Sequence, residues 1–187
     1  MDNNDILIRL RYALNIRDTD MVKIFKLGGV ELTTEEVRKL LIKSKETYRY
    51  NDEVDEHDEI EEKEENIKCK NSMLESFLNG FIIYKRGKQD PKPGQPEIPV
   101  LKNSENHPNN IMLKKLKIAL SLTSDDVLDI IAETGVIVTK GELSAIFRKE
   151  GHKNYKECGD KYARNFIKGL AIRNRGQVPT TRSLQKN

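Results

Sequence analysis

The 187-residue chain carries one sequence unit twice, and this duplication constrains its fold more than any other feature. Residues 3–43 align without gaps with residues 109–149 at an offset of 106, and thirteen of the forty-one positions are identical. Chance gives on the order of three identities in such a comparison, so the similarity marks an internal repeat. The alignment resumes at an offset of 89 with six further identical pairs: Cys69/Cys158, Phe77/Phe166, Gly80/Gly169, Ile83/Ile172, Arg86/Arg175 and Gly87/Gly176. The fold must therefore be one that can be built twice in tandem.

The start of each copy predicts an amphipathic helix. In the first copy, one apolar stripe at helical spacing is formed by Ile6, Leu7, Leu10, Ala13 and Leu14. The second copy keeps an apolar residue at each of these positions. Both copies begin with a pair of asparagines, and the second of each pair, Asn4 or Asn110, is a residue type suited to capping a helix. We therefore predict that these asparagines are helix caps and not a binding motif.

Three further helices in each copy are delimited by cap and stop signals. A second helix should run from Asp18, as its cap, to the paired glycines at 28–29. A capping box at Thr33 and Glu36, which returns in the second copy, should start a third helix. A fourth apolar stripe spans about residues 71–86. The sequence thus predicts an all-α protein made of two tandem copies of a small four-helix unit.

The segments between the helices predict the domain organisation. We expect a first helical repeat over residues 1–88, a Pro-rich linker over 89–108, a second repeat over 109–177 and a disordered tail over 178–187. The acidic segment 44–68 is expected to be a flexible insertion, because it lacks apolar periodicity and is shorter by 17 residues (106 − 89) in the second copy. The sequence leaves open whether this insertion is helical, and whether the two repeats pack together.

Charge is distributed unevenly along the chain. The formal net charge is only +3, but residues 46–65 hold eleven acidic and two basic residues, and residues 140–187 hold twelve basic and four acidic residues. Such a basic segment is either a solvated surface or a face for an acidic partner, which could be nucleic acid or the chain's own acidic segment. Eight side chains are candidate contacts to phosphate or to a protein partner: Arg148, Lys149, Lys153, Lys161, Arg164, Lys168, Arg173 and Arg175.

The residues that could carry chemistry do not form a recognisable catalytic or metal-binding motif. Cys69 and Cys158 lie just before the fourth helix of each repeat, and we expect them to be structural. His152, Cys158 and Asp160 share one short loop, but the first copy has no histidine at the matching place. We predict neither a metal site nor a cofactor, and we expect a protein that is not an enzyme.

The composition also indicates where the protein works. No apolar run approaches the roughly 18 residues of a membrane span, and the N-terminus lacks a secretion signal. Two cysteines without such a signal are typical of reduced thiols in the cytoplasm. We therefore expect a cytoplasmic protein with no membrane partner. The oligomeric state is not predicted.

Three features together resemble a known family. They are the paired asparagines, the run of residues 152–160 in the second copy and the Phe-x-x-Gly helix that ends in Arg-Gly. They resemble the YehS-like family of uncharacterised bacterial proteins (DUF1456), which carries its domain in two copies. The resemblance covers about residues 3–43, 69–88 and 109–177. It implies a cytoplasmic, all-helical protein and no particular activity.

Two classes of function remain at this stage. Helical repeats without a catalytic set favour a non-catalytic interaction or regulatory module with an unknown protein partner. The alternative is a nucleic-acid-binding protein that uses the basic second repeat on the phosphate backbone.

Overall fold

A computed structural model describes residues 1–43, 66–88 and 107–176, which form eight α-helices and no β-strand. The first repeat contributes α1 (Asn3–Ala13), α2 (Asp18–Leu27), α3 (Thr34–Leu40) and α4 (Asn71–Arg86). The second repeat contributes α5 (Pro108–Ala119), α6 (Ser124–Ala132), α7 (Lys140–Phe147) and α8 (Asp160–Arg175). The prediction of an all-α protein with two tandem four-helix units is confirmed. Most of the predicted insertion, linker and tail lies outside the described residues.

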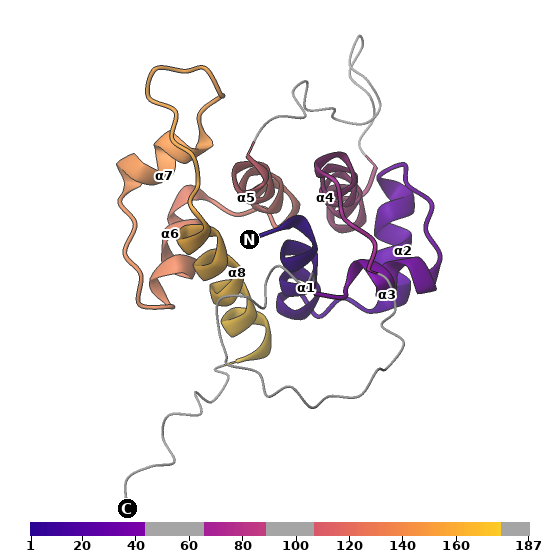
Figure 1. The fold of residues 1–187 in the computed structure, drawn as a ribbon. Coiled ribbons are helices and arrows are strands. Elements are labelled where there is room, and N and C mark those ends of the chain that lie inside the picture. The colour runs from indigo at the N-terminus through magenta and orange to yellow at the C-terminus, as the bar shows by residue number, and fades with distance from the viewer. Residues whose placement is uncertain (44–65, 89–106, 177–187) are drawn as a thin grey trace, which may run out of the picture.

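The two repeats interlock through their first and fourth helices. Helix α1 of the first repeat packs against α8 of the second, and α4 packs against α5. Helices α2 and α3 lie on one side of these four helices, and α6 and α7 lie on the other side (Figure 1). The buried apolar residues of both repeats form one continuous cluster. The repeats are therefore packed together, and each completes the hydrophobic core of the other.

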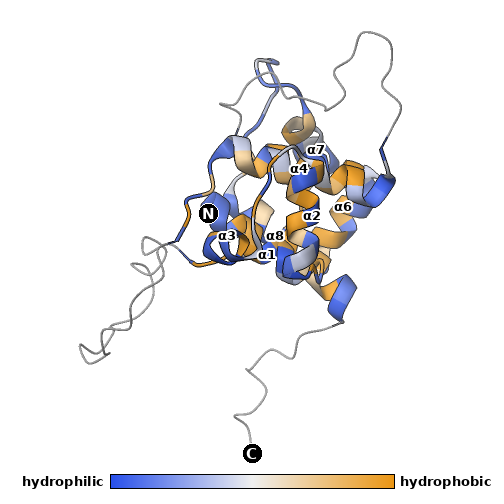
Figure 2. Cartoon of the chain, turned by 90° about the vertical axis from the view of Figure 1, so that its right-hand side faces the viewer, coloured by the Kyte–Doolittle hydropathy of each residue, from blue (hydrophilic) through white to orange (hydrophobic). Residues whose placement is uncertain are grey.

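The helices carry most of the apolar residues, whereas the connections at the edge of the molecule are mostly hydrophilic (Figure 2). In the first repeat the core contains an aromatic cluster, in which the ring centroids of Phe25 and Phe77 are 5.1 Å apart and those of Phe77 and Phe81 are 6.3 Å apart. Burial of each of these rings contributes on the order of 1.5–3 kcal/mol. The second repeat keeps only Phe166 of this cluster and fills the other two positions with Ile131 and Leu170.

Two equivalent glycines allow close helix crossings. A Cβ atom on Gly80 of α4 would overlap the backbone carbonyl of Ile24 in α2. A Cβ atom on Gly169 of α8 would overlap the carbonyl of Ile130 in α6 in the same way. Both the glycines and the isoleucines that they face are identical between the two copies. A close backbone approach of this kind requires glycine on one side. The same helix crossing is therefore built in both repeats.

The predicted capping boxes are present. Thr33 Oγ1 accepts a hydrogen bond from the Glu36 N–H at 3.1 Å, and Glu36 Oε2 accepts one from the Thr33 N–H at 2.7 Å. Thr139 and Glu142 form the same box at the start of α7. A third box, which the sequence analysis did not predict, starts α6.

The prediction that Asp18 caps α2 is wrong. Arg17 occupies the cap position in an extended conformation, and Asp18 is the first helical residue. The Asp18 carboxylate instead pairs with Arg11 of α1 at 2.7 Å and with Arg38 of α3 at 3.4 Å. A carboxylate in the first helical turn is still favourable there, because the helix N-terminus carries partial positive charge.

The prediction that Asn4 and Asn110 cap helices is also wrong. Asp2 caps α1, with its side chain accepting from the Asp5 N–H at 2.7 Å. His107 precedes α5, and Pro108, which the sequence analysis placed in the linker, is its first residue. Both asparagines therefore lie inside the first helical turn and are buried.

Each of these asparagines instead joins three segments of its repeat. Asn4 Nδ2 donates to the carbonyls of Leu40 at 2.8 Å and Ile67 at 2.7 Å, and Asn4 Oδ1 accepts from the Cys69 N–H at 2.9 Å. This amide ties the end of α3 and the approach to α4 onto α1. Ile67 was expected within the flexible insertion, but it belongs to the folded repeat.

Asn110 makes the equivalent contacts in the second repeat. Its Nδ2 donates to the carbonyls of Ile146 and Lys156, both at 3.0 Å, and its Oδ1 accepts from the Cys158 N–H at 2.8 Å. A buried backbone group needs a hydrogen-bond partner, and a side-chain amide offers both a donor and an acceptor. This requirement explains why the asparagines are identical in the two copies.

Candidate functional site

Equivalent helices of the two repeats meet twice, once in the α4–α5 interface and once in the α1–α8 interface. The offsets of 106 and 89 place three pairs of residues at equivalent positions: Arg9/Lys115, Glu75/Arg164 and Asn79/Lys168. Two of these pairs change charge between the interfaces. The two interfaces therefore bring together the same positions of the repeat and differ in their electrostatics.

The α4–α5 interface is closed by a buried charge pair. Lys115 of α5 is only 4% exposed, and its Nζ lies 3.5 Å from Glu75 Oε1 and donates to Asn79 Oδ1. Burial lowers the pKa of Lys115 from its ordinary value of 10.5, while the Glu75 carboxylate acts in the opposite direction. An acid and an amide on α4 thus compensate the one cation that α5 buries.

The α1–α8 interface instead carries cations at the positions of that acid and amide. Arg164 and Lys168 of α8 line a pocket of about 730 Å³ together with Arg9 of α1. The apolar part of the lining comes from both helices and consists of Ile8, Tyr12, Ala13, Ile167, Ala171 and Ile172. Its charged part consists of Asp5, Arg9, Lys43, Glu133, Arg164 and Lys168. A volume of this size is typical of small-molecule sites.

The acids of the pocket lining are already engaged by arginines. Both oxygens of Asp5 lie 2.9 Å from Arg9 Nε, and Glu133 Oε1 lies 2.7 Å from Arg173 Nε. Lys43 and Lys168 are exposed and have no acidic partner among the described residues. The pocket therefore combines an apolar lining with two lysines whose charge the described part of the fold leaves uncompensated.

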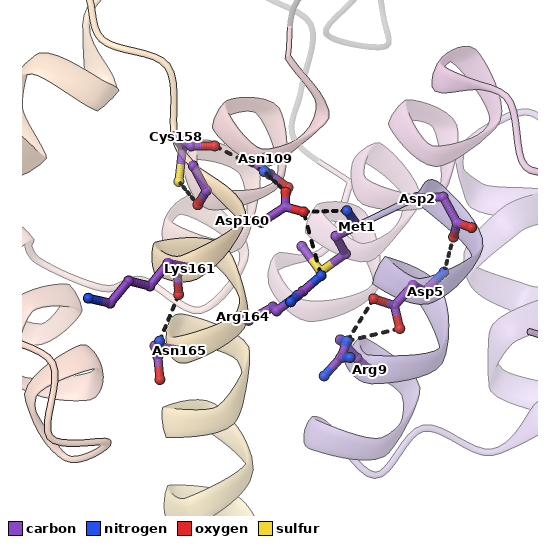
Figure 3. A network of polar contacts seen from close by, with 11 residues as sticks. Met1, Asp2, Asp5, Arg9, Asn109, Cys158, Asp160, Lys161, Arg164 and Asn165 are labelled. Atoms are coloured by element: carbon purple, nitrogen blue, oxygen red, sulfur yellow. Dashed lines mark hydrogen bonds and ion pairs between the residues drawn. The ribbon is translucent and has the colours of Figure 1, made fainter. Parts of the chain in front are cut away.

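A polar cluster lies beside the pocket, where α8 begins (Figure 3). Asp160 accepts hydrogen bonds from Asn109 Nδ2, at 2.9 Å, and from the N-terminal ammonium of Met1. The same carboxylate lies 3.6 Å from Arg164 Nη2. Burial alone would raise the pKa of Asp160, but the Met1 ammonium and the Asn109 amide lower it below its ordinary value. Asp160 therefore stays ionised and holds Arg164 toward α1.

Besides Arg164, two of the predicted contact residues are engaged within the fold. Arg173 pairs with Glu133. Arg175 Nε donates to the carbonyl of Tyr12 at 2.6 Å, and its guanidinium lies 4.2 Å from the centroid of the Tyr12 ring. Arg86, the equivalent of Arg175, contacts the carbonyl of Ile118 at the end of α5. These two arginines thus fasten the end of helix four to the end of helix one in the other repeat.

The fold brings only two of the predicted residues into the pocket. Arg164 and Lys168 line the pocket, whereas Arg148, Lys149 and Lys153 lie at the end of α7 and in the loop that follows it. The side chain of Lys161 points away from Met1 and α1 (Figure 3).

Sequence reasoning missed the part of the site that the first repeat contributes. Arg9, Tyr12 and Lys43 line the pocket, but none was a candidate, because all eight candidates lie in the basic second repeat. A comparison of equivalent positions would not have found them, because Arg9 and Lys43 align with Lys115 and Lys149; the change of charge from Glu75 to Arg164 marks only the α8 side of the pocket.

The described residues also bear on the chemistry of the cysteines and the histidine. Burial raises the pKa values of Cys69 and Cys158 to about 12, so both thiols are protonated at neutral pH. His152 Nδ1 accepts from the N–H of Asn154 at 3.2 Å. Residues 1–43, 66–88 and 107–176 contain no group of three or more His, Cys, Asp or Glu residues that could hold a metal ion. The helices of the same ranges include none with the length and apolar character needed to cross a bilayer.

Fold and pocket together define a duplicated all-α protein with a ligand-sized pocket between its repeats. The chain belongs to the family described as "Protein of unknown function (DUF1456)", which matches residues 3–87 and 109–176. It is 39% identical over 173 residues to the "Uncharacterized protein YehS" of Escherichia coli (strain K12), and the match covers 92% of this chain and 96% of that protein. No solved structure matches the chain. The resemblance seen in the sequence is thereby confirmed.

Proposed function

We propose that this protein is a non-catalytic binding module, with a regulatory or interaction role, that takes its ligand in the pocket between α1 and α8. The observation that carries the proposal is this pocket of about 730 Å³, whose lining is contributed by both repeats. The two free, buried cysteines support a cytoplasmic location for this activity.

Because the pocket lies between the two repeats, a ligand bound there would affect how the repeats pack. A ligand that contacts both α1 and α8 stabilises their packing by mass action, in proportion to how far its concentration exceeds its dissociation constant. Because α1 and α8 belong to different repeats, the ligand would couple one half of the fold to the other. This coupling is how a module without catalytic groups could transmit a signal.

Backbone NMR of the full ¹⁵N-labelled chain tests this proposal. A set of neutral and charged fragment molecules is titrated into the protein, and amide shifts are mapped onto the helices. The expected result is that shifts cluster on α1 and α8 for at least one fragment class. Shifts confined to other helices, or an absence of shifts for every fragment class, would overturn it.

Nucleic-acid binding is the second candidate function. The observation in its favour is that Lys149, Lys153 and Lys161 are exposed and have no acidic partner in the described part of the chain. Fluorescence anisotropy with a labelled single-stranded RNA and a labelled DNA duplex, measured across a salt series, tests it. Binding should weaken steeply as salt rises and on substitution of these lysines by glutamate. Absence of binding to either probe at low salt would remove this candidate.

A further inference from the structure

We infer that the α1–α8 pocket binds an amphipathic anion, a small molecule with an apolar body and one carboxylate, sulfonate or phosphate head group. This inference rests on the proposed function and adds the chemical class of the ligand. Its basis is the difference between two interfaces that the duplication made equivalent.

The first step compares the charge at one equivalent position of the two interfaces. In the α4–α5 interface the carboxylate of Glu75 lies 3.5 Å from the Nζ atom of Lys115. The equivalent position of the α1–α8 interface holds Arg164, so a cation stands where the compensating anion would be. One interface therefore contains its own counter-charge, and the other accumulates positive charge around a pocket. Asp5 and Asp160 offset the two arginines of that interface, so an anion from outside the chain would compensate the lysines that remain.

The second step concerns where the head group would bind. Asp5 engages Arg9, and Asp160 lies 3.6 Å from Arg164, so these two arginines already have acidic partners. The two pocket lysines, Lys43 from the first repeat and Lys168 from the second, have none among the described residues. A head group held by both would make charge-assisted hydrogen bonds, which are stronger than neutral ones. The two lysines are therefore the expected anchors, one from each repeat.

The third step concerns the body of the ligand. Six of the twelve residues that line the pocket are apolar. Ile167 and Ala171 are almost completely buried, while Ile8 and Ile172 are half-buried. These side chains offer no hydrogen bonds to a sugar or to a polyol, and burying such groups against them would be unfavourable. An aliphatic or aromatic body fits this surface, and the charged rim orients it.

The fourth step is a variant that removes the difference between the interfaces. Arg164→Glu with Lys168→Asn gives α8 the residue types that α4 carries at the equivalent positions. The new carboxylate would face Arg9 as Glu75 faces Lys115. This double variant should lose the ligand and become more stable to heat, which distinguishes loss of the site from loss of the fold.

The experiment uses the full chain and the fluorescent aromatic sulfonate 8-anilinonaphthalene-1-sulfonate as the probe. We expect saturable enhancement of probe fluorescence, displaced by decanoate, with at least tenfold weaker displacement by the neutral decanol and none by pyrophosphate. The Arg164→Glu/Lys168→Asn variant should lose the enhancement, and so should Lys168→Asn alone if the double variant does not fold. The matched control Lys161→Glu/Lys149→Asn makes the same change in charge outside the pocket and should bind the probe as the natural chain does.

Each other outcome overturns a defined part of the inference. Equal displacement by decanol and decanoate would show that the pocket takes apolar ligands without need of a charge, and the proposed function would stand without this inference. Displacement by pyrophosphate would show that the anion alone is recognised, and would overturn the apolar body. Probe binding that survives in the double variant and is lost in the control would place the site elsewhere, and both proposals would fail.

Discussion

Arg9 and Lys115 occupy the same position of the two repeats, and they lie in opposite electrostatic surroundings. Lys115 is buried against the carboxylate of Glu75 in the α4–α5 interface. Arg9 is exposed, is held by Asp5 of its own helix, and shares a pocket with the cation Arg164. The duplication has thus diverged into one closed interface and one open one, and the open interface is the candidate site.

Closure of the α4–α5 interface should depend on both members of its charge pair. Glu75→Leu alone should lower the free energy of unfolding by about 3 kcal/mol, because it leaves the ammonium of Lys115 buried without a carboxylate. Adding Lys115→Met should recover most of that loss, since an apolar pair of similar volume needs no compensation. Urea denaturation of the single and double variants measures both changes. A double variant no more stable than the single one would contradict this account.

The same pair should leave a signature in the pH dependence of stability. Burial lowers the pKa of Lys115 in the folded chain below its ordinary value of 10.5. Between the folded value and 10.5 the unfolded chain binds more protons, so the free energy of unfolding contributed by this group should rise with pH in that window. The Glu75→Leu/Lys115→Met variant should lack this rise. Urea midpoints compared at about pH 8 and about pH 10 would show the difference between the two chains.

The isolated repeats should differ in how they associate. A homodimer of residues 1–88 would bring Arg9 opposite Glu75, whereas a homodimer of residues 109–176 would bring Lys115 opposite Arg164 and Lys168. Because each repeat completes the core of the other, we expect the first fragment to dimerise and the second to stay largely unfolded. Sedimentation velocity and circular dichroism measure the two properties. Two folded, monomeric fragments would show that each repeat has a sufficient core of its own.

The asparagines at the start of each repeat should matter for stability far more than helix caps do. Asn110→Ala removes a side chain that makes three hydrogen bonds to buried or partly buried backbone. We expect a loss of about 3 kcal/mol in the free energy of unfolding, because the backbone groups lose their partners. Asn165→Ala on the outer side of α8 serves as the control and should change stability by less than about 0.5 kcal/mol. Equal effects of the two substitutions would contradict the role of Asn110 in joining three segments of its repeat.

The two crossing glycines should tolerate no side chain. Gly80→Ala and Gly169→Ala should each lower the free energy of unfolding by about 2 kcal/mol, because the new methyl group would displace the backbone of the facing helix. Gly141 of α7 is the matched control, since a Cβ atom there would meet nothing within 4 Å. Gly141→Ala should be neutral or slightly stabilising. Chemical denaturation of the three variants tests the prediction, and a Gly80→Ala protein as stable as Gly141→Ala would refute the close crossing.

The insertion in the first repeat can be tested by shortening. Removing residues 46–62 deletes the 17 residues by which the first repeat exceeds the second (106 − 89). The melting temperature should stay within about 3 °C of that of the natural chain, because loop length contributes only weakly to stability. A larger loss in a thermal scan would mean that the segment is part of the fold.

Several elements of the fold could be predicted because their causes are local. The capping boxes at Thr33 and Thr139 need only residues three positions apart, and the helix stripes need only one helical period. The roles of Asn4 and Asn110 could not be predicted, because their partners lie 36 or more residues away in the chain. Asn is common at helix caps, so local reasoning favoured the wrong role. Asp18 was misassigned for the same reason, since Arg11 and Arg38 reach it from other helices.

The sequence by itself determined that the chain is a duplicated all-α protein, because a repeat and its helical periodicity are properties of the order of residues. It also determined which copy is basic. Only the tertiary structure decided that helix one of each repeat packs on helix four of the other, since that choice depends on apolar surfaces far apart in the chain. Because of this packing between repeats, the difference between Glu75 and Arg164 becomes a difference between a closed interface and an open pocket. The candidate site therefore belongs to neither repeat alone, and no reading of one repeat could have found it.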